Sequence, residues 1–205
     1  LTSIVNYVDL LKKEDMPSPA AREYVDVLDR QSKRLKKLTE DLVEASKASS
    51  GALNVELQPT DVNVLLSQIE GEYQERLAAC HLTLVTQPPA PGTMIQADSR
   101  LLSRVMDNLV SNVCKYALEN TRVYVTAAVR DGQAVISFKN VSRDELNISP
   151  DELMERFVRG DASRHSEGSG LGLSIARSLV QLQGGTFALS IDADLFRADI
   201  VFPLI

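Results

Sequence analysis

The chain has no tryptophan, only two cysteines and two histidines, and no excess of basic residues among its 205 positions. Two cysteines are too few for a disulfide-stapled fold, so we expect Cys80 and Cys114 to be reduced and the chain to be intracellular. No apolar run approaches the ~20 residues that a membrane span requires, and no signal peptide opens the chain. The net charge of −6, without a basic patch with interleaved aromatics, indicates no nucleic-acid partner.

One amphipathic helix is expected around residues 101–116, because apolar residues recur there at helical spacing. Asn108, Asn112 and Lys115 share a different face of this helix. Amide oxygens can ligate Mg²⁺, and a lysine can neutralise phosphate oxygens. Taken alone, however, this face is better explained as a solvated polar stripe.

A glycine-rich segment, Glu167-Gly-Ser-Gly-Leu-Gly-Leu-Ser174, precedes a second apolar-periodic run. Such a loop opening a helix offers backbone N–H groups and a positive dipole end to an anion. A dinucleotide fingerprint would require a strand directly before Gly168. The polar residues 161–167 stand there instead, which excludes that interpretation.

Together, Asn108-xxx-Asn112-xx-Lys115-Tyr116, Glu155-Arg-Phe-Val-Arg-Gly-Asp161 and Gly168-Ser-Gly-Leu-Gly-Leu173 resemble the catalytic part of bacterial sensor histidine kinases. The resemblance covers nearly the whole chain. Gyrase-type, Hsp90-type and MutL-type ATPases share the same ATP-binding sandwich.

The resemblance implies that the chain binds ATP and Mg²⁺. It implies that Asn112 and Asn108 ligate the metal. It also implies catalytic roles for Asn108, Lys115 and Arg159, of which Arg159 would stabilise charge near the γ-phosphate. Arg159 could equally be a solvated arginine, and Tyr116 a packing residue. The nucleotide-binding residues that the resemblance implies are Asn108, Asn112, Lys115, Tyr116, Asn140, Arg159, Gly168, Ser169, Gly170, Leu171, Gly172 and Leu173.

Residues 1–50 are expected to form a helical hairpin, with one helix to about Lys13, a proline-containing break at 15–19 and a second helix over about 20–48. Its apolar stripe exceeds what one partner helix covers, which predicts a homodimeric four-helix bundle. The alternative is a hairpin packed on its own domain. Residues 49–51 read as the interdomain hinge. The heptad seam consists of Tyr24, Leu28, Gln31, Leu35, Leu38, Leu42 and Ala45.

In the family the hairpin carries a phosphoacceptor motif, His-Glu-x-Lys-Thr-Pro, followed by Leu-Thr-x-Ile. This chain opens with Leu1-Thr-Ser-Ile4, so the accepting histidine is expected just upstream and absent from the chain. His81 and His165 lack that context, and we expect both to be ordinary surface residues.

Residues 51–205 are expected to form the catalytic domain, an α+β two-layer sandwich with one mixed sheet and three helices on one face. Arg130-Asp-Gly132 has hairpin turn chemistry, Asp98 is expected to cap the asparagine helix, and Asp61 or Thr60 to cap the helix before it. The expected strands are 53–57, 81–86, 94–97, 123–129, 135–139, 186–191 and 196–202, and the expected helices are 62–79, 99–116 and one after the glycine loop.

The ATP lid is expected over about residues 141–167, a long polar segment with one short helix starting at Ser149 or Pro150. The family has Asp-x-Gly-x-Gly at its start, where this chain has Asn140-Val-Ser-Arg-Asp144. Asn140 can still accept a hydrogen bond from the adenine amino group, but a charge-assisted bond is lost. We therefore expect weaker affinity and looser adenine selectivity. Without the glycines, the lid entry is less free to adopt positive φ.

The favoured function is the catalytic core of a sensor histidine kinase in a two-component phosphorelay, passing the γ-phosphoryl group to a histidine and then to an aspartate of a response regulator. By resemblance, the chain would be the intracellular part of a membrane-anchored sensor. One alternative is a dimerisation and signalling module that has lost nucleotide binding. Another is an ATPase of the same superfamily, but those relatives carry a glutamate at the position of Asn108, and an amide cannot act as that base.

Overall fold

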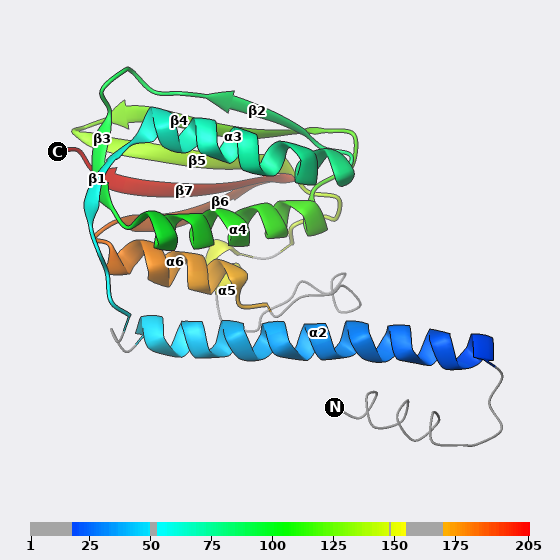
Figure 1. Cartoon of the computed structure of the whole chain (residues 1–205). Coiled ribbons are helices and arrows are strands. Elements are labelled where there is room, and N and C mark those ends of the chain that lie inside the picture. The colour runs from blue at the N-terminus through cyan, green and yellow to red at the C-terminus, as the bar shows by residue number, and fades with distance from the viewer. Residues whose placement is uncertain (1–17, 50–52, 148, 155–169) are drawn as a thin grey trace.

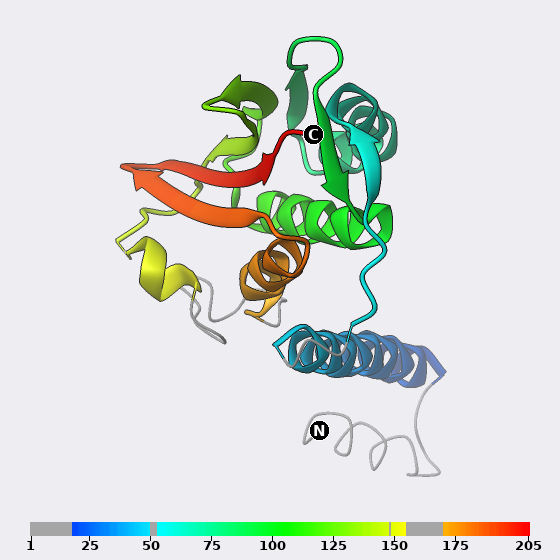
Figure 2. The ribbon, with the colours of Figure 1, turned by 90° about the vertical axis from the view of Figure 1, so that its left-hand side faces the viewer.

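A mixed five-stranded sheet, ordered β2-β4-β5-β7-β6, forms one layer of the fold, and helices α3, α4 and α6 cover one of its faces (Figures 1 and 2). The computed structural model describes residues 18–49, 53–147, 149–154 and 170–205. The expected α+β sandwich is confirmed. Its elements are α2 Ser18–Ser49, β1 Gln58–Asp61, α3 Val62–Ala79, β2 Thr83–Gln87, β3 Met94–Ala97, α4 Ser99–Tyr116, β4 Arg122–Arg130, β5 Gln133–Val141, α5 Pro150–Met154, α6 Gly172–Leu182, β6 Thr186–Asp192 and β7 Leu195–Pro203.

The core lies between the sheet and the three helices, because strand side chains alternate between the two faces. In β7, Phe196, Ala198, Ile200 and Phe202 are buried while the intervening residues are half-buried. Among the strands of this sheet that the structure describes, β2 and β4 pair in parallel and the other pairs are antiparallel. Among the helices in the described ranges, none is long and apolar enough to cross a bilayer.

The predicted hairpin turn at Asp131-Gly132 is confirmed. Both residues have positive φ, 49° and 73°, which is the conformation that a two-residue type I′ turn requires and that Gly adopts without strain. The strands on either side, β4 and β5, are a few residues longer than their apolar alternation suggested.

The prediction of a strand over residues 53–57 is wrong. Alternating Leu53, Val55 and Leu57 suggested it, but these residues lack regular structure and Leu57 is 47% exposed. The strand is β1, which starts five residues later at Gln58 and pairs antiparallel with β3 in a second, two-stranded sheet. The expectation of a single sheet was therefore incomplete. Periodicity failed here because the backbone N–H of Glu56 bonds to the Asp98 side chain rather than to a strand.

Strand β2 starts at Thr83, two residues later than predicted. His81 has a φ of 56° and donates its backbone N–H to Ala78, so it belongs to the turn after α3. His81 is exposed, as expected for a surface residue. His165 lies outside the described residues.

Helix α2 lies alongside α6, below the sandwich in both views (Figures 1 and 2). Its bounds confirm the predicted second helix of the hairpin, and Pro19 falls in its first turn, where a missing N–H costs nothing. The predicted first helix, up to about Lys13, lies outside the described residues, as do residues 50 and 51 of the predicted hinge.

Asp98 joins the segment before β1 to the first turn of α4. Its side chain accepts hydrogen bonds from the backbone N–H of Glu56, Arg100 and Leu101, and it pairs with the Arg100 guanidinium at 3.0 Å. Its own N–H donates to the amide oxygen of Gln183, just after α6. Burial raises the pKa of the Asp98 carboxyl, but these bonds outweigh it and hold the pKa at about 2. The predicted caps at Asp98 and Asp61 are both confirmed.

Gly185 is predicted to tolerate no side chain. A Cβ there would lie 2.7–2.9 Å from Phe202, Val180 and the Val201 carbonyl. Gly185→Ala should lower the free energy of unfolding by about 1–3 kcal/mol through overpacking. The control is Gly71→Ala in α3, where nothing lies within 4 Å and helix propensity should add about 0.5–1 kcal/mol. Denaturant unfolding compares the two, and equal effects would contradict the packing argument.

Asp98 should stabilise the fold only while it is charged. Its folded pKa of about 2 lies below the unfolded value of 3.8, so its contribution is complete above about pH 4 and is lost as the pH falls toward 2. At neutral pH, Asp98→Asn should cost about 1–2 kcal/mol, and the cost should shrink across that window. Asp192→Asn, at the exposed end of β6, is the control. A cost independent of pH would count against the ionised cap.

Candidate functional site

The helix of the asparagine motif and the helix of the glycine motif meet at Asn108. Its Nδ2 donates to the carbonyl of Arg104 at 2.9 Å. Its Oδ1 faces Gly172, since a Cβ on that glycine would lie 3.4 Å from this oxygen. Two segments far apart in the sequence are thus brought together as predicted. The absence of a side chain at position 172 allows the close approach.

The N-terminus of α6 has no side-chain cap at its N-cap residue, Leu171. Helices α3 and α4, by contrast, are capped by aspartates. Leu171 is 1% exposed and holds the start of α6 in the core, while Gly170 has a φ of 72°. A helix start without a capping carboxylate leaves its first N–H groups and its positive dipole end able to bind an anion.

Asn140 lies at the end of β5 with 4% of its surface exposed. Its Nδ2 donates to the Val141 carbonyl at 3.2 Å, and that carbonyl also accepts from the Leu118 N–H at 2.9 Å. A carbonyl can only accept, so the NH₂ of the amide must face it. The buried Oδ1 of Asn140 accepts no hydrogen bond from any residue that the structure describes. An acceptor without a partner in the core is costly unless a ligand supplies the donor.

The segment after Asn140 is bonded to the end of α4. Ala117 and Ser142 form an isolated bridge, and the Arg143 N–H donates to the Tyr116 carbonyl at 2.8 Å. The Arg143 guanidinium also reaches the Lys115 carbonyl at 3.4 Å, where a cation favours the negative end of the helix. Within residues 141–147 no φ is positive. The chain therefore passes this point in an ordinary conformation, although the family's glycines are absent.

The remaining predicted site residues fall into two groups. Asn112 and Tyr116 are half-buried on α4, and Lys115 is exposed in its last turn. Leu173 is buried in the first turn of α6. Arg159, Gly168 and Ser169 lie outside the described residues, as do Arg156 and Phe157 of the predicted lid.

The predicted short helix after residue 149 is confirmed as α5. Ser149 and Glu152 bond reciprocally: the Ser149 N–H and hydroxyl donate to the carboxylate at 3.0 and 2.8 Å, and the Glu152 N–H donates back to the hydroxyl at 3.2 Å. This is a capping box. The Ser149 N–H and then its hydroxyl lower the pKa of Glu152.

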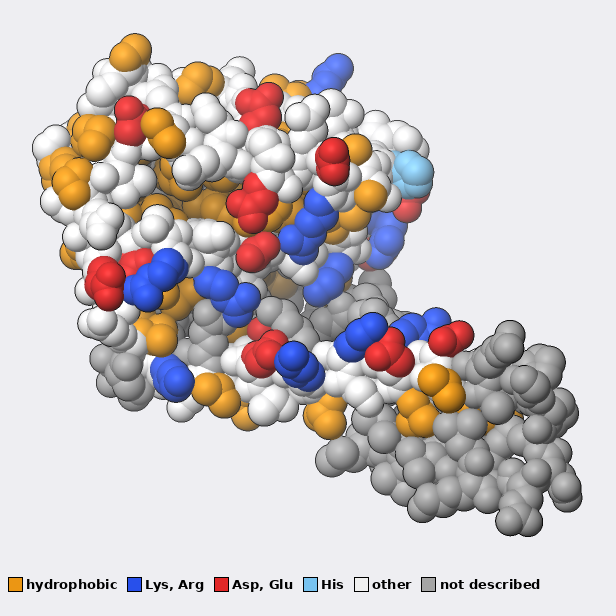
Figure 3. Space-filling model, viewed as in Figure 1, with side chains coloured by type: hydrophobic (Ala, Val, Ile, Leu, Met, Phe, Trp, Pro, Cys, Tyr) orange, Lys and Arg blue, Asp and Glu red, His pale blue; other side chains and the backbone are white. Residues whose placement is uncertain are grey.

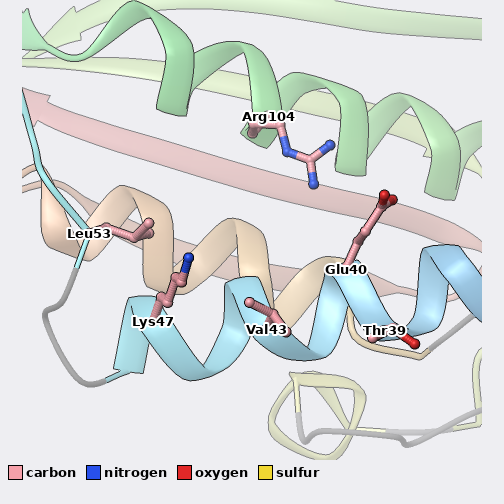
Figure 4. A pocket seen from close by; sticks show the side chains of 6 residues that line it. All are labelled: Thr39, Glu40, Val43, Lys47, Leu53 and Arg104. Atoms are coloured by element: carbon pink, nitrogen blue, oxygen red, sulfur yellow. The ribbon is translucent and has the colours of Figure 1, made fainter.

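A groove of about 350 Å³ lies between α2 and α4, near residue 53. In Figure 4, Glu40 on α2 and Arg104 on α4 point toward each other across it, with Val43 and Lys47 beside them. Arg104 lies one turn before Asn108. None of the predicted nucleotide-binding residues lines the groove, so it is separate from the candidate site.

Sequence reasoning missed the residues that position the site. Gln183 is 4% exposed and joins Asp98 to the Leu179 carbonyl. In the sequence, the one feature that could have indicated this role is that Gln183 is a polar residue directly after the apolar run of α6. Arg143 gave no signal, because its role depends on α4 ending opposite β5.

Family comparisons match both parts of the chain. Residues 97–200, about half of the chain, match the model of histidine kinase-, DNA gyrase B- and HSP90-like ATPases. Residues 1–51 match the model of the His Kinase A phospho-acceptor domain.

Curated relatives are sensor kinases. The sensor protein VanS of Enterococcus faecium is 30% identical over 191 residues, which cover 90% of this chain and 48% of VanS. The signal transduction histidine-protein kinase BaeS of Escherichia coli is 33% identical over 157 residues, covering 74% of this chain and 32% of BaeS. The chain thus spans a half or less of these relatives.

Solved histidine kinases share the fold. The Acinetobacter baumannii kinase AdeS superposes with a TM-score of 0.74 at 15% identity, covering 99% of this chain and 94% of that one. ShkA in complex with AMPPNP gives 0.74 at 23% identity over 98% of this chain and 42% of that one. ThkA in complex with the response regulator TrrA gives a TM-score of 0.73 at 18% identity, covering 100% of this chain and 57% of that one. With both family models and the sensor-kinase relatives in agreement, the chain belongs to the bacterial sensor histidine kinases.

Proposed function

We propose that this chain is the ATP-binding catalytic core of a sensor histidine kinase, which transfers the γ-phosphoryl group of ATP to a histidine for relay to a response-regulator aspartate. The observation that carries the proposal is the meeting of Asn108 with the uncapped start of α6. It supplies a surface where amide oxygens and backbone N–H groups converge. The VanS and BaeS relatives support the same activity.

The adenine end of the nucleotide would lie at Asn140. Its buried Oδ1 is fixed as an acceptor by the bond from Nδ2 to Val141, and adenine offers an N6 amino donor where guanine offers the O6 acceptor. Reversing the amide would turn its oxygen toward the Val141 carbonyl. This supports retention of adenine selectivity even though the family's carboxylate is absent.

The phosphate end would lie over the first turn of α6, where Gly170, Gly172 and Leu173 supply backbone N–H groups. Lys115, together with Arg159, would neutralise the phosphate oxygens. Gly168 and Ser169 would continue the loop. These assignments rest on the family motif and on the open helix start.

Magnesium would be held by the amide oxygen of Asn112, with Asn108 nearby, and by phosphate oxygens. In the described part of the chain there is no group of three or more carboxylate, imidazole or thiol side chains suited to a metal. A site that relies on substrate phosphates is typical of Mg²⁺, which neutralises their charge when bound. The protein's own contribution would be to position the nucleotide and exclude water.

The proposed domain organisation follows the two family matches: a phosphoacceptor hairpin over residues 1–50 and a catalytic domain over 51–205, with the lid at about 141–167. Dimerisation through the hairpin is supported by the apolar side of α2 that faces away from the sandwich (Figure 3). Elsewhere than at the groove, α2 carries three exposed large apolar residues, Val25, Leu35 and Leu42, which are 53%, 38% and 53% exposed. A response regulator as partner is supported by the ThkA complex. Placement inside the cell, as part of a membrane-anchored sensor, stays a prediction.

Asn140→Ala should weaken binding of ADP and of a non-hydrolysable ATP analogue about tenfold or more, because one buried hydrogen bond is worth about 1–3 kcal/mol when its partner is left unpaired. The ratio of adenine to guanine nucleotide affinity should also fall. Calorimetric titration measures both. The matched control is Asn54→Ala, an exposed amide outside the lid that should leave binding unchanged.

Asn112→Ala should remove the magnesium dependence of nucleotide binding while leaving the metal-free affinity within about twofold, because only a metal ligand is lost. Titrations with and without Mg²⁺ test this, again against Asn54→Ala. In a version extended upstream with the family's histidine motif, the variant should also abolish autophosphorylation. A folded wild-type chain that binds no nucleotide at millimolar concentration would support the nucleotide-deficient signalling module instead.

A further inference from the structure

Helices α3 and α4 run side by side in the same direction (Figure 1), and an ion pair joins them, from Arg76 Nη1 to Asp107 Oδ1 at 3.3 Å. Residues four and seven positions further along a helix return to the same face. Those positions hold Cys80, which ends α3, and Cys114, in the last turn of α4. The Cys114 sulfur lies 4.0 Å from the Arg76 carbonyl, so the two helix ends are in contact.

The Cys114 thiol approaches the carbonyl of Arg76, one helical turn before Cys80, so the two thiols are neighbours, and both cysteines are free and half-buried. Burial, and after it the neighbouring Cys80 thiol, raise the pKa of the Cys114 thiol to about 12. Cys114 therefore keeps its proton at neutral pH, and its thiol faces the Arg76 carbonyl. A thiol at a helix end, half open to solvent and next to a second thiol, is the arrangement in which a disulfide can form.

We propose that Cys80 and Cys114 form a reversible disulfide when a peroxide oxidises the protein. The Cys80 sulfur attacks the peroxide O–O bond and becomes a sulfenic acid, releasing one water. The Cys114 sulfur then attacks the Cys80 sulfur, the S–O bond breaks, and the hydroxide leaves with the Cys114 proton as a second water. The two thiols lose two electrons in total, and one peroxide is reduced.

This bond would act on the nucleotide site, a consequence that rests on the function proposed above. A covalent bond holds two sulfurs closer than a non-covalent contact does, so it draws the last turn of α4 toward α3. Lys115 and Tyr116 directly follow Cys114, and their carbonyls bond to Arg143. Displacing that turn changes where Lys115 lies relative to Asn140. Oxidation should therefore weaken nucleotide binding about fivefold or more, the usual lower size of coupling between two sites.

The first test treats the chain with hydrogen peroxide, alkylates the remaining thiols and measures intact mass. The expected product is a monomer that has lost two hydrogens, takes up no alkylating reagent and regains both thiols with dithiothreitol. In Cys80→Ser one alkylatable thiol should remain, in Cys114→Ser the remaining Cys80 should gain oxygen as a sulfenic acid or a higher oxidation product, and in neither variant should an internal disulfide form. Two thiols that stay alkylatable in folded, peroxide-treated protein would overturn the proposal, and so would a disulfide between two chains.

The second test compares nucleotide affinity of the reduced and oxidised chain by calorimetry, with Cys80→Ser as the peroxide-insensitive control. Equal affinities in both states would overturn the regulatory consequence. If the reduced chain fails to bind nucleotide, the proposed function fails, while the disulfide is still decided by mass.

Discussion

Helix α4 is held at both ends, and every other feature of the candidate site depends on this. At its start, the buried carboxylate of Asp98 binds the first N–H groups of the helix and the backbone before β1. At its end, the segment following Asn140 bonds to the carbonyls of Lys115 and Tyr116. Between these points its apolar face is buried, so its polar face is presented in one orientation.

Because α4 is fixed, α6 can meet it at a single defined place. The contact between Asn108 and Gly172 needs a residue without a side chain on α6 and an amide whose NH₂ is already bound to its own helix. The same arrangement leaves the start of α6 uncapped. A capping aspartate at this position would place negative charge where an anionic ligand is to bind. Of the three helices that cover the sheet, α3 and α4 have an aspartate cap and α6 has no side-chain cap at its N-cap residue.

The groove between α2 and α4 brings helix α2 close to the candidate site. The oppositely charged side chains of Glu40 and Arg104 line this groove. The backbone carbonyl of Arg104 also accepts the hydrogen bond from Asn108 Nδ2 that orients the Asn108 amide. The α4 residue that faces α2 across the groove, Arg104, is therefore one helical turn from Asn108 in the candidate site. Asp98 makes a similar connection through the segment that leads from α2 into β1. These links run through the backbone and through buried polar groups, which transmit displacement better than exposed side chains do.

The sequence by itself determined the helices, the hairpin turns, both aspartate caps and the pairing of the asparagine and glycine motifs, because periodicity, turn chemistry and capping act over a few residues. It misplaced the strand before α3, since alternation at Leu53 and Leu57 does not reveal which backbone groups lie opposite. It identified Asn140 as an acceptor, but only the tertiary structure decided the orientation of its amide, through the carbonyl of Val141. The roles of Gln183 and Arg143, and the meeting of Cys80 with Cys114, were likewise decided by which helix ends the fold brings together.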